Sequence, residues 1–370
     1  MTTRVLITGG AGFIGSHVAD LLLATGRSVR ILDSLCSQVH GDSRPDYLSP
    51  DAELLIGDVR DRDAVERALR GVDAVIHLAA AVGVGQSMYE IKSYTDVNDV
   101  GTAVLMEALA RRPIERLICA SSMSIYGEGL ALNSDGEIVE PEERPLAQLR
   151  RGEWELRGPS GEPLTPLPTP ESKRPALTSV YALNKYSQER LCLIAGKTYG
   201  IPTVALRFFN VYGPRQALSN PYTGVLAIFA SRLLHDRPPL VFEDGLQRRD
   251  FVHVRDVAQA CLLALTPGRG SAAAFNIGSG ESRTILSIAE ELARVMGRDS
   301  VTARVVGKYR AGDIRHCFAD IAKSRSELGF APSVAFRDGL EELAEWLGGQ
   351  CAVDSVERAT AELERRGLVA

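Results

Sequence analysis

The sequence predicts an α/β protein with a doubly wound parallel sheet and a smaller mixed α/β lobe toward its C-terminus. Up to about residue 125, continuous apolar runs alternate with amphipathic stretches, a rhythm typical of parallel strands that helices cover on both faces. The first apolar run leads directly into a glycine-rich turn. With 370 residues the chain is long enough for about two folding units, so a second lobe fits beside the sheet.

The expected strands share a continuous apolar character and are bounded by polar residues or glycine. They are Val5 to Thr8, Val29 to Leu32, Glu53 to Ile56, Ala74 to Leu78 and Arg116 to Ala120. The expected helices between and after them have amphipathic periodicity. They are residues 14–25, 61–70 and 96–111, a helix that begins at Ser179, and residues 256–265, with a further strand over 203–208.

Composition and charge exclude several classes of protein. Hydrophobic residues at 45% and charged residues at 24% are ordinary globular usage, which excludes disorder, collagen and coiled coil as the main architecture. The formal net charge of -5 gives no electrostatic reason for nucleic-acid or membrane binding. No apolar stretch is long enough for a membrane span and the N-terminus predicts a strand instead of a signal peptide, so we expect a cytoplasmic protein. The 6 scattered cysteines predict reduced structural thiols and no metal site.

The first strand is followed by a glycine motif that reads TGGAGFIG. It contains GxGxxG at Gly10, Gly12 and Gly15, and GxxGxxG when Gly9 is counted in place of Gly10. Glycines allow the backbone to turn sharply and approach a pyrophosphate, whose charge then lies at the N-terminus of the next helix. With a strand before it and a helix after it, the motif predicts a Rossmann-type dinucleotide site.

Asp33 closes the second strand, 18 positions after Gly15, where a carboxylate can accept both hydroxyls of an adenosine ribose. The same charge repels a 2′-phosphate, and Ser34 follows instead of an arginine, so NAD is favoured over NADP. Asp58, with Val59 just after the third strand, is positioned either to accept from the adenine amino group or to cap the following helix. Both interpretations stay open.

A second motif, YxxxK, places Tyr181 and Lys185 on one face of the expected helix. A free tyrosine has a pKa of about 10, but a neighbouring lysine and a cationic nicotinamide both favour the phenolate. Such a phenolate can take a proton from an alcohol while hydride leaves its carbon. Hydroxyl groups also follow the fifth strand at Ser121, Ser122 and Ser124, at the edge of the sheet where ligands bind.

Taken together, the motifs resemble those of the extended short-chain dehydrogenase/reductase family, specifically its sugar-nucleotide epimerases and dehydratases. The resemblance covers residues 3–347 apart from one insertion. The motifs that carry it occur in the family's order: the glycine motif, Asp33, His77-Leu78-Ala79-Ala80, Ser122 with Tyr126-Gly127, Tyr181 with Lys185, Arg207-Phe208-Phe209-Asn210, and Arg249-Asp250-Phe251-Val252-His253.

The resemblance implies a role for each matching residue. Ser122 hydrogen-bonds the reacting sugar hydroxyl, Tyr181 is the general base, and Lys185 binds the nicotinamide ribose and lowers the tyrosine pKa. Further positions implied along the NAD are Phe13, Ile14, Leu78, Ala79, Ala80, Asn98 and Phe208. Positions implied for a nucleotide-diphosphate sugar are Met123, Ser124, Asn210, Arg215, Val225, Arg249 and Arg310, with Asp313 on the nucleoside ribose. His77 and His253 are expected to be packed structural histidines.

Two residues bear on which reaction follows oxidation at sugar C4. The dehydratases of this family have an Asp-Glu pair directly after the active-site Ser or Thr, where this chain has Met123 and Ser124. Neither side chain can protonate a leaving hydroxyl, so dehydration is disfavoured, and no charged groups for decarboxylation are identified. Epimerisation needs no additional catalytic group and regenerates NAD in each cycle. A silent redox-sensing regulator is a third hypothesis, against which the intact Ser122, Tyr181 and Lys185 argue.

The insertion indicates a narrower group. Its sequence from Glu153 to Gly161 and from Leu167 to Glu171, with Gly312 to Asp320, resembles bacterial dTDP-L-rhamnose 4-epimerases. This resemblance implies conversion of dTDP-L-rhamnose to dTDP-6-deoxy-L-talose. UDP-glucose and UDP-glucuronate remain alternative substrates. A homodimer is implied through helices near 98–111 and 181–199.

These patterns divide the chain into four parts. Residues 1–178 form the predicted NAD-binding Rossmann domain, including an insertion or lid at about 129–178 that is rich in proline and mixed charges. Residues 179–210 continue this domain with the catalytic helix. Residues 211–347 form mainly a nucleotide-sugar-binding lobe with some returning Rossmann elements. Residues 348–370 form a helical tail.

Overall fold

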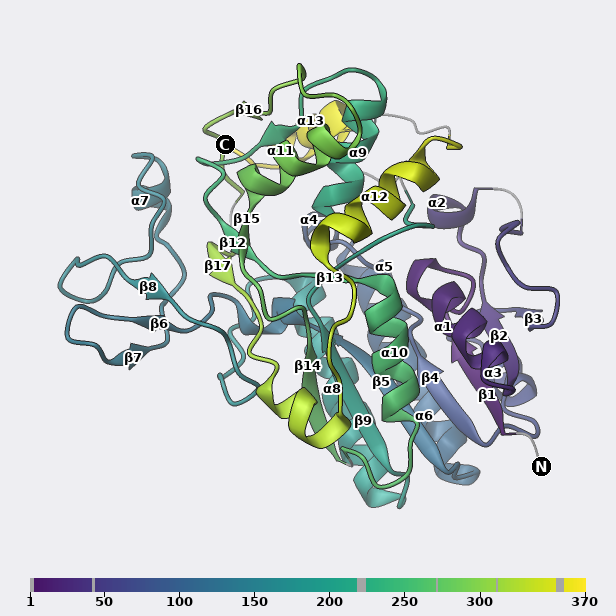
Figure 1. Ribbon diagram of the computed structural model, residues 1–370. Helices are drawn as coiled ribbons and strands as arrows, with labels where there is room; N and C mark the ends of the chain where they lie inside the picture. The colour runs from purple at the N-terminus through teal and green to yellow at the C-terminus, as the bar shows by residue number, and fades with distance from the viewer. Residues whose placement is uncertain (1–2, 42–43, 218–223, 271, 311, 351–355) are drawn as a thin grey trace.

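The computed structural model describes residues 3–41, 44–217, 224–270, 272–310, 312–350 and 356–370. Its centre is a 7-stranded parallel sheet with strand order β14-β9-β5-β4-β1-β2-β3 (Figure 1). The strands are β1 (Arg4–Thr8), β2 (Ser28–Asp33), β3 (Glu53–Ile56), β4 (Ala74–His77), β5 (Arg116–Ser122), β9 (Thr203–Phe208) and β14 (Ala273–Ile277). The predicted Rossmann-type sheet is therefore confirmed.

The strand order reverses between β1 and β4, because the chain builds outward from β1 through β2 and β3 and then returns to β1's other side. Val5 of β1 pairs with Val29 of β2 on one side and Ala74 of β4 on the other. In open α/β sheets, ligands bind beyond the carboxyl ends of the strands at such a reversal point. The glycine motif lies there.

Helices cover both faces of the sheet. On one face α1 (Phe13–Ala24) packs against α10 (Val254–Ala264). On the other face lie α3 (Arg62–Ala68), α6 (Gly101–Arg111) and α8 (Val180–Thr198), the last two in contact. The two faces have separate hydrophobic cores, which is why the strands between them carry mainly apolar side chains.

The C-terminal lobe has its own core between three helices, α9 (Val225–Leu234), α11 (Ile285–Val295) and α12 (Phe336–Leu347). Short strands surround it: β10 (Asn210–Tyr212), β11 (Leu240–Val241), β12 (Arg248–Arg249), β13 (Phe251–His253), β15 (Arg283–Thr284), β16 (Arg304–Val305) and β17 (His316–Cys317). These elements confirm the smaller mixed α/β lobe. Strand β14 and helix α10 return from this part of the chain to the central sheet.

The segment at 129–178 projects from one side of the molecule (Figure 1). It forms a 3-stranded antiparallel sheet from β6 (Ala131–Leu132), β7 (Ile138–Val139) and β8 (Thr165–Pro166), with one short helix, α7 (Leu146–Leu149). Ala131, Leu156 and Leu164 form a small core inside it. The sequence indicated a segment outside the main core, and the structure adds that this segment has a core of its own.

The remaining elements are short: α2 (Ser37–His40), α4 (Val84–Ser87), α5 (Ile91–Thr95), the π-helix η1 (Asp96–Val100), the 3-10 helix η2 (Met123–Tyr126), the π-helix η3 (Ser324–Leu328) and the tail helix α13 (Val356–Arg365). The helix expected over 96–111 therefore begins as a π-helix. Of the cysteines, Cys119, Cys192, Cys261 and Cys317 are buried free thiols and Cys36 is an exposed one, whereas Cys351 lies outside the described residues.

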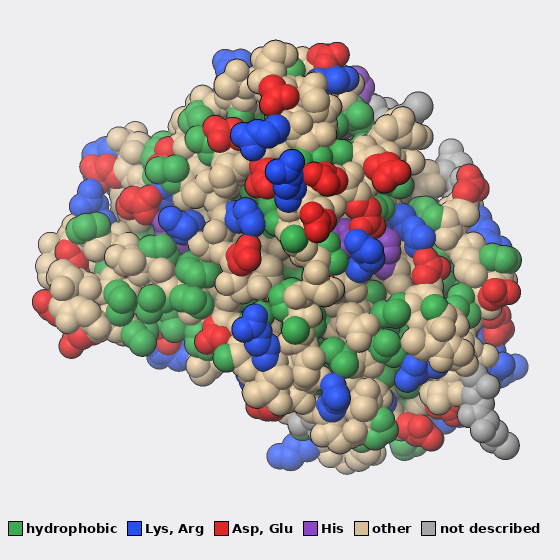
Figure 2. All heavy atoms as spheres, in the orientation of Figure 1, with side chains coloured by type: hydrophobic (Ala, Val, Ile, Leu, Met, Phe, Trp, Pro, Cys, Tyr) green, Lys and Arg blue, Asp and Glu red, His purple; other side chains and the backbone are tan. Residues whose placement is uncertain are grey.

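Among the described helices, none combines the length and the apolar character that crossing a membrane requires. On the face drawn in Figure 2, acidic and basic side chains are interspersed over both lobes. That mixture agrees with the small net charge.

Candidate active site

Two glycines of the first turn have no room for a side chain. Gly9 has a φ of +70, and a Cβ there would lie 2.8 Å from the backbone nitrogen of Ala79. A Cβ on Gly15 would lie only 2.4 Å from the carbonyl oxygen of Gly9. Gly12 precedes α1, whose first turn contains no acidic side chain. The turn is thus a bare backbone cradle at a helix N-terminus, which fits the pyrophosphate of NAD.

Asp33 lies at the end of β2 beside this cradle and is 8% exposed. Its Oδ2 accepts from the N–H of Ala11 at 3.0 Å, and its Oδ1 accepts from the N–H of Leu35 at 2.9 Å. These two bonds fix the carboxylate at the edge of the glycine turn and leave lone pairs for ribose hydroxyls. Ser34, the next residue, is exposed. The set of residues therefore fits NAD.

Asp58 does not cap the helix that follows it. Its carboxylate accepts from Arg60, at 2.8 Å from the backbone N–H and at 2.6 Å from the guanidinium Nη2. This pairing lowers the pKa of Asp58. Helix α3 is capped instead by Asp61, which accepts from the N–H of Asp63 at 2.9 Å. The capping interpretation of Asp58 is therefore wrong, and its adenine contact stays a prediction. Val59 is buried.

Ser122 and Tyr181 meet at the carboxyl edge of the sheet. Ser122 ends β5, Tyr181 lies in the first turn of α8, and their side chains are hydrogen-bonded to each other. The Ser124 hydroxyl donates to Ser122 Oγ at 2.9 Å. Ser179 caps α8 by accepting from the Ala182 N–H at 3.1 Å, which fixes where the helix begins. Two predicted catalytic side chains are thus brought together by two different elements.

The protonation of Tyr181 is set mainly by its surroundings. Burial raises the pKa of Tyr181 to about 12, and the hydrogen bond with Ser122 acts in the opposite direction. Burial also lowers the pKa of Lys185, whose Nζ donates to Gln188 Oε1 at 2.8 Å. The sequence predicted a lowered tyrosine pKa, but here burial outweighs the hydrogen bond with Ser122, and the Lys185 ammonium donates to Gln188. That Lys185 and a cationic nicotinamide together lower the pKa of Tyr181 stays a prediction.

His77 belongs to a buried hydrogen-bonded chain that joins four elements. Its Nδ1 lies 2.7 Å from Thr8 Oγ1 in β1, and its Nε2 lies 2.9 Å from Thr102 Oγ1 in α6. Gln188 of α8 donates to the same Thr102 oxygen at 2.8 Å. His77 is therefore a packed structural histidine. His253, which caps α10, is likewise buried.

Buried His77 predicts a loss of stability in acid. Burial lowers the pKa of His77 to about 3, so its contribution is complete above pH about 6.5 and is lost as the pH falls toward 3. At pH 5 this loss amounts to about 2 kcal/mol of unfolding free energy. In His77→Gln, the difference in unfolding free energy between pH 7 and pH 5, measured by urea denaturation, should shrink by that amount. An unchanged pH dependence would contradict the assignment.

The segment after β4 is held against the glycine turn. The backbone N–H of Leu78 donates to the Thr8 carbonyl at 3.0 Å, and Asn98, wholly buried in η1, forms two hydrogen bonds with the backbone of Ala81, at 2.7 and 3.1 Å. The positions implied along the NAD occur here and nearby: Leu78, Ala79 and Ala80 are half-buried, Phe13 and Ile14 begin α1, and Phe208 ends β9. The structure thus places Leu78 to Ala80 and the start of α1 at the reversal point, and Phe208 two strands from β4 in the same sheet.

Among the predicted substrate residues, Arg249 and Asp313 lie together. The Arg249 guanidinium lies 3.5 Å from the Asp313 carboxylate and donates to the carbonyl of Arg315 at 3.0 Å. Arg310 is exposed and its guanidinium stacks over the Phe242 ring at 4.5 Å. A cavity of about 530 Å³ is lined by Asp313 together with residues 140–143 and 173–178.

Other predicted substrate residues lie elsewhere. Arg215 pairs with Asp20 of α1 at 2.6 Å, which places it against the helix that follows the glycine turn. Asn210 begins β10, and its Oδ1 is buried without a hydrogen-bond partner among the described residues. Val225 begins α9 and Met123 is buried. Their roles toward a substrate stay predictions.

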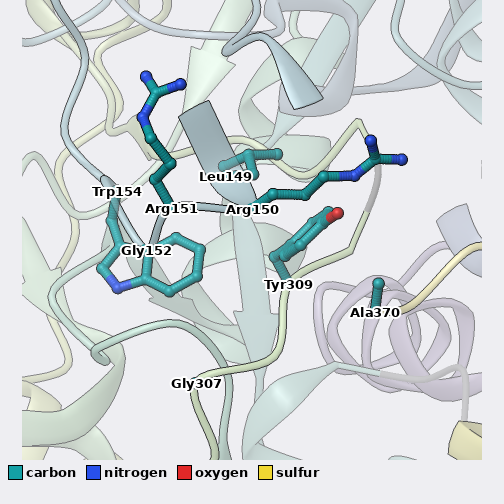
Figure 3. Close-up of a pocket in the computed structure, with 8 residues that line it drawn as sticks. All are labelled: Leu149, Arg150, Arg151, Gly152, Trp154, Gly307, Tyr309 and Ala370. Atoms are coloured by element: carbon teal, nitrogen blue, oxygen red, sulfur yellow. The ribbon is translucent and has the colours of Figure 1, made fainter. Parts of the chain in front are cut away.

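A second cavity, also of about 530 Å³, lies where the insertion meets the C-terminus (Figure 3). Trp154 and Tyr309 face each other across it with ring centroids 6.3 Å apart. The side chains of Arg150 and Arg151 extend from the same loop (Figure 3). None of the residues that line it was predicted for catalysis or NAD binding.

Sequence reasoning missed two residues that hold the catalytic helix in place. Gln188 accepts from Lys185, and its position three residues later on one helix face was a usable signal. Ser87 accepts from the backbone N–H of Tyr181 at 3.0 Å. No sequence signal indicates Ser87, because the two residues lie far apart in the chain.

The glycine turn, Asp33, and the Ser122–Tyr181–Lys185 group together define an NAD-dependent enzyme of the extended short-chain dehydrogenase/reductase type. A model of the NAD dependent epimerase/dehydratase family matches residues 5–148 and 158–278, and the chain belongs to this family. Its cofactor is NAD.

Curated relatives include both epimerases and dehydratases. The dTDP-L-rhamnose 4-epimerase of Burkholderia thailandensis is 37% identical over an alignment of 351 residues that covers 93% of this chain and 94% of that protein. The dTDP-glucose 4,6-dehydratase of Streptomyces niveus is 30% identical, and the match covers 93% of this chain and 92% of that protein. Among solved structures, the UDP-glucose 4-epimerase of Thermotoga maritima with UDP-glucose has a TM-score of 0.77 at 30% identity, covering 94% of this chain and 99% of its own.

Proposed function

We propose that the enzyme is a nucleotide-sugar 4-epimerase that converts dTDP-L-rhamnose to dTDP-6-deoxy-L-talose. The observation that carries the proposal is the hydrogen-bonded Ser122–Tyr181 pair, which is followed by Met123 and Ser124 where a dehydratase needs an acid and a base. This set can move one proton from an alcohol but holds no second acid-base pair.

In the proposed mechanism, Ser122 Oγ hydrogen-bonds the C4 hydroxyl and Tyr181 Oη takes its proton. NAD, when bound, supplies the hydride acceptor and returns the hydride at the end of the cycle. Lys185 adds positive charge that favours the phenolate over the neutral phenol. The same Tyr181 Oη gives the proton back after the 4-ketosugar has turned over, so protons and hydride both balance.

Dehydration is disfavoured on chemical grounds. Met123 is apolar and buried, and the Ser124 hydroxyl already donates to Ser122. Glu128, a buried carboxylate close by in sequence, accepts from the backbone N–H groups of Arg315 and His316 and is thereby engaged in structure. Burial raises the pKa of Glu128 to about 7, but both of its oxygens accept from these N–H groups, so we infer that it does not protonate a leaving C6 hydroxyl.

The proposed sugar rests on the 37% identical relative, a dTDP-L-rhamnose 4-epimerase, and on Met123. An apolar side chain after Ser122 suits a 6-deoxy sugar, whose C6 is a methyl group. UDP-glucose and UDP-glucuronate are the alternative substrates, because epimerases of both are similar to this chain in structure, at 30% and 28% identity.

The test incubates the enzyme separately with dTDP-L-rhamnose, UDP-glucose and UDP-glucuronate in D₂O, followed by NMR and mass spectrometry. We expect the C4 epimer of dTDP-L-rhamnose with the mass unchanged and no deuterium on carbon, since the same hydride leaves and returns. A product that has lost water or carbon dioxide, or has gained carbon-bound deuterium, would overturn the proposed reaction. Turnover of only a UDP-sugar would overturn the proposed substrate.

We also propose a homodimer formed through α8 and the adjoining η1. Leu183 and Ile194 of α8 are 51% and 56% exposed, and they lie three helical turns apart on one face. Val100 of η1 is 46% exposed. Helix α8 and η1 are in contact, and exposed apolar side chains on contacting helices suit burial against a second copy.

The dimer is tested by light scattering after gel filtration. Wild-type protein should elute at about twice the chain mass of 40.0 kDa, whereas Leu183→Glu with Ile194→Glu should elute as a monomer. Charges buried opposite each other in a symmetric interface cost several kcal/mol, which suffices to separate the subunits. A wild-type monomer would overturn the proposal.

A further inference from the structure

The insertion is joined to the C-terminal lobe by a cluster of charged side chains with a buried centre and two partly exposed members, Glu155 and Asp244. We call it the Arg144 cluster: Arg144, Glu155, Glu243, Asp244 and Arg315. The first two belong to the insertion and the other three to the C-terminal lobe. The Arg144 side chain is 2% exposed, that of Glu243 is 1% exposed and that of Arg315 is 0% exposed. Such burial costs free energy unless the charges are closely paired.

The geometry of the cluster supplies that pairing. The Arg144 guanidinium donates two parallel hydrogen bonds to the Glu243 carboxylate, both 2.9 Å long. Arg315 donates to the same carboxylate at 2.9 Å and to Asp244 at 2.7 and 2.9 Å. The Nη2 of Arg315 also donates to Glu155 Oε1 at 2.5 Å. Glu243 is therefore shared by one arginine from each part of the molecule.

The cluster acts on the segment Asp313–His316, which leads into β17. Arg144 Nη2 donates to the first carbonyl oxygen of this segment at 3.0 Å. Glu128 accepts from the backbone N–H groups of its last two residues, at 2.7 and 3.0 Å. Arg249 donates to its two middle carbonyl oxygens. Every residue of the segment is thus held by a buried charged side chain.

We propose that the insertion positions this segment for the substrate's nucleotide and that Arg144 is the positioning residue. The inference rests on the proposed function, and on the roles that the family resemblance implies for Arg249 at the diphosphate and Asp313 at the nucleoside ribose. Loss of Arg144 removes the bond to the Asp313 carbonyl and one of two partners of Glu243. The segment then has to be ordered by the nucleotide itself, which weakens binding.

The same loss leaves the chemistry untouched. Ser122 and Tyr181 lie on β5 and α8, and the Arg144 cluster has no member on either element. The NAD cradle is formed by the turn between β1 and α1. A positioning role therefore predicts a change in nucleotide affinity without a change in kcat or in bound NAD.

The experiment compares Arg144→Met and Arg144→Lys with Arg151→Met in the NAD-loaded full chain. Lysine keeps the buried charge but cannot make the paired bonds, so it remains informative if methionine prevents folding. Arg151 is the matched control, an arginine of the same insertion that is 59% exposed and pairs with Glu153. KM and kcat are measured with dTDP-L-rhamnose, and Kd is measured with dTDP by calorimetry.

We expect both Arg144 variants to raise KM and the Kd of dTDP about tenfold, with kcat within about twofold and NAD content unchanged, since one lost charge-assisted bond corresponds to about one such factor. Arg151→Met should match wild type. Two results for the variants would overturn the inference: a fall in kcat at unchanged KM, or unchanged dTDP affinity in the folded lysine variant. A wild-type enzyme that binds neither dTDP nor UDP would also overturn it.

The proposed function can fail separately. If wild type binds dTDP but does not epimerise the sugar, weaker dTDP binding by the variants still supports the inference while the proposed function fails.

Discussion

Tyr181→Phe is expected to lower kcat for epimerisation by about 10²–10⁴-fold, the range that one positioned acid-base group contributes. The substitution removes only the phenolic oxygen that shares a hydrogen bond with Ser122. Burial raises the pKa of this phenol to about 12, so the neutral ring of phenylalanine suits the site and the fold should persist. NAD content should stay equal to wild type.

Interconversion of dTDP-L-rhamnose and its C4 epimer is followed by NMR at saturating substrate. Tyr199→Phe is the matched control, because Tyr199 follows the same helix α8 and is 49% exposed. It should retain wild-type kcat. A Tyr181→Phe enzyme with more than a tenth of wild-type kcat would assign the proton transfer to another group.

The parallel sheet was predictable because its strands are buried on both faces. In a chain that also contains amphipathic helices, a continuous apolar run such as Ala74 to Leu78 indicates a strand that is buried on both faces. Strand β4 indeed covers Ala74–His77. The end of β5 was less predictable. It runs through Ser122 instead of stopping at Ala120, because sheet pairing with β9 continues to Phe208 and outweighs the polar character of the serines.

The NAD cradle was predictable because local chain geometry requires the glycines there. The Arg144 cluster was not, because its arginines and carboxylates come from parts of the chain about 100 residues apart, as the spacing of Arg144 and Glu243 illustrates. An isolated arginine in a sequence resembles any surface charge, and only the fold brings it to a buried partner. The same reason explains why Arg215 was expected near the diphosphate, whereas its guanidinium pairs with Asp20.

Gly15→Ala is expected to weaken NAD binding by about 10- to 100-fold. The added Cβ would lie 2.4 Å from the carbonyl oxygen of Gly9 and 2.6 Å from the Cα of Gly10. Both are backbone atoms, so the turn and the start of α1 must move apart. Overpacking of this kind costs about 1–3 kcal/mol, and each 1.4 kcal/mol is a factor of ten in affinity. The displacement alters the cradle where the pyrophosphate lies.

The NAD that co-purifies with each variant is quantified by chromatography after heat release, and Kd is measured on protein stripped of NAD. Gly349→Ala is the matched control, because a Cβ there would meet its nearest atom at 3.8 Å, an ordinary contact. It should bind NAD as wild type does. If Gly15→Ala retained NAD in equal amount and with equal Kd, the glycine turn could not be where the pyrophosphate binds, since any ligand held by those backbone N–H groups must respond to their displacement.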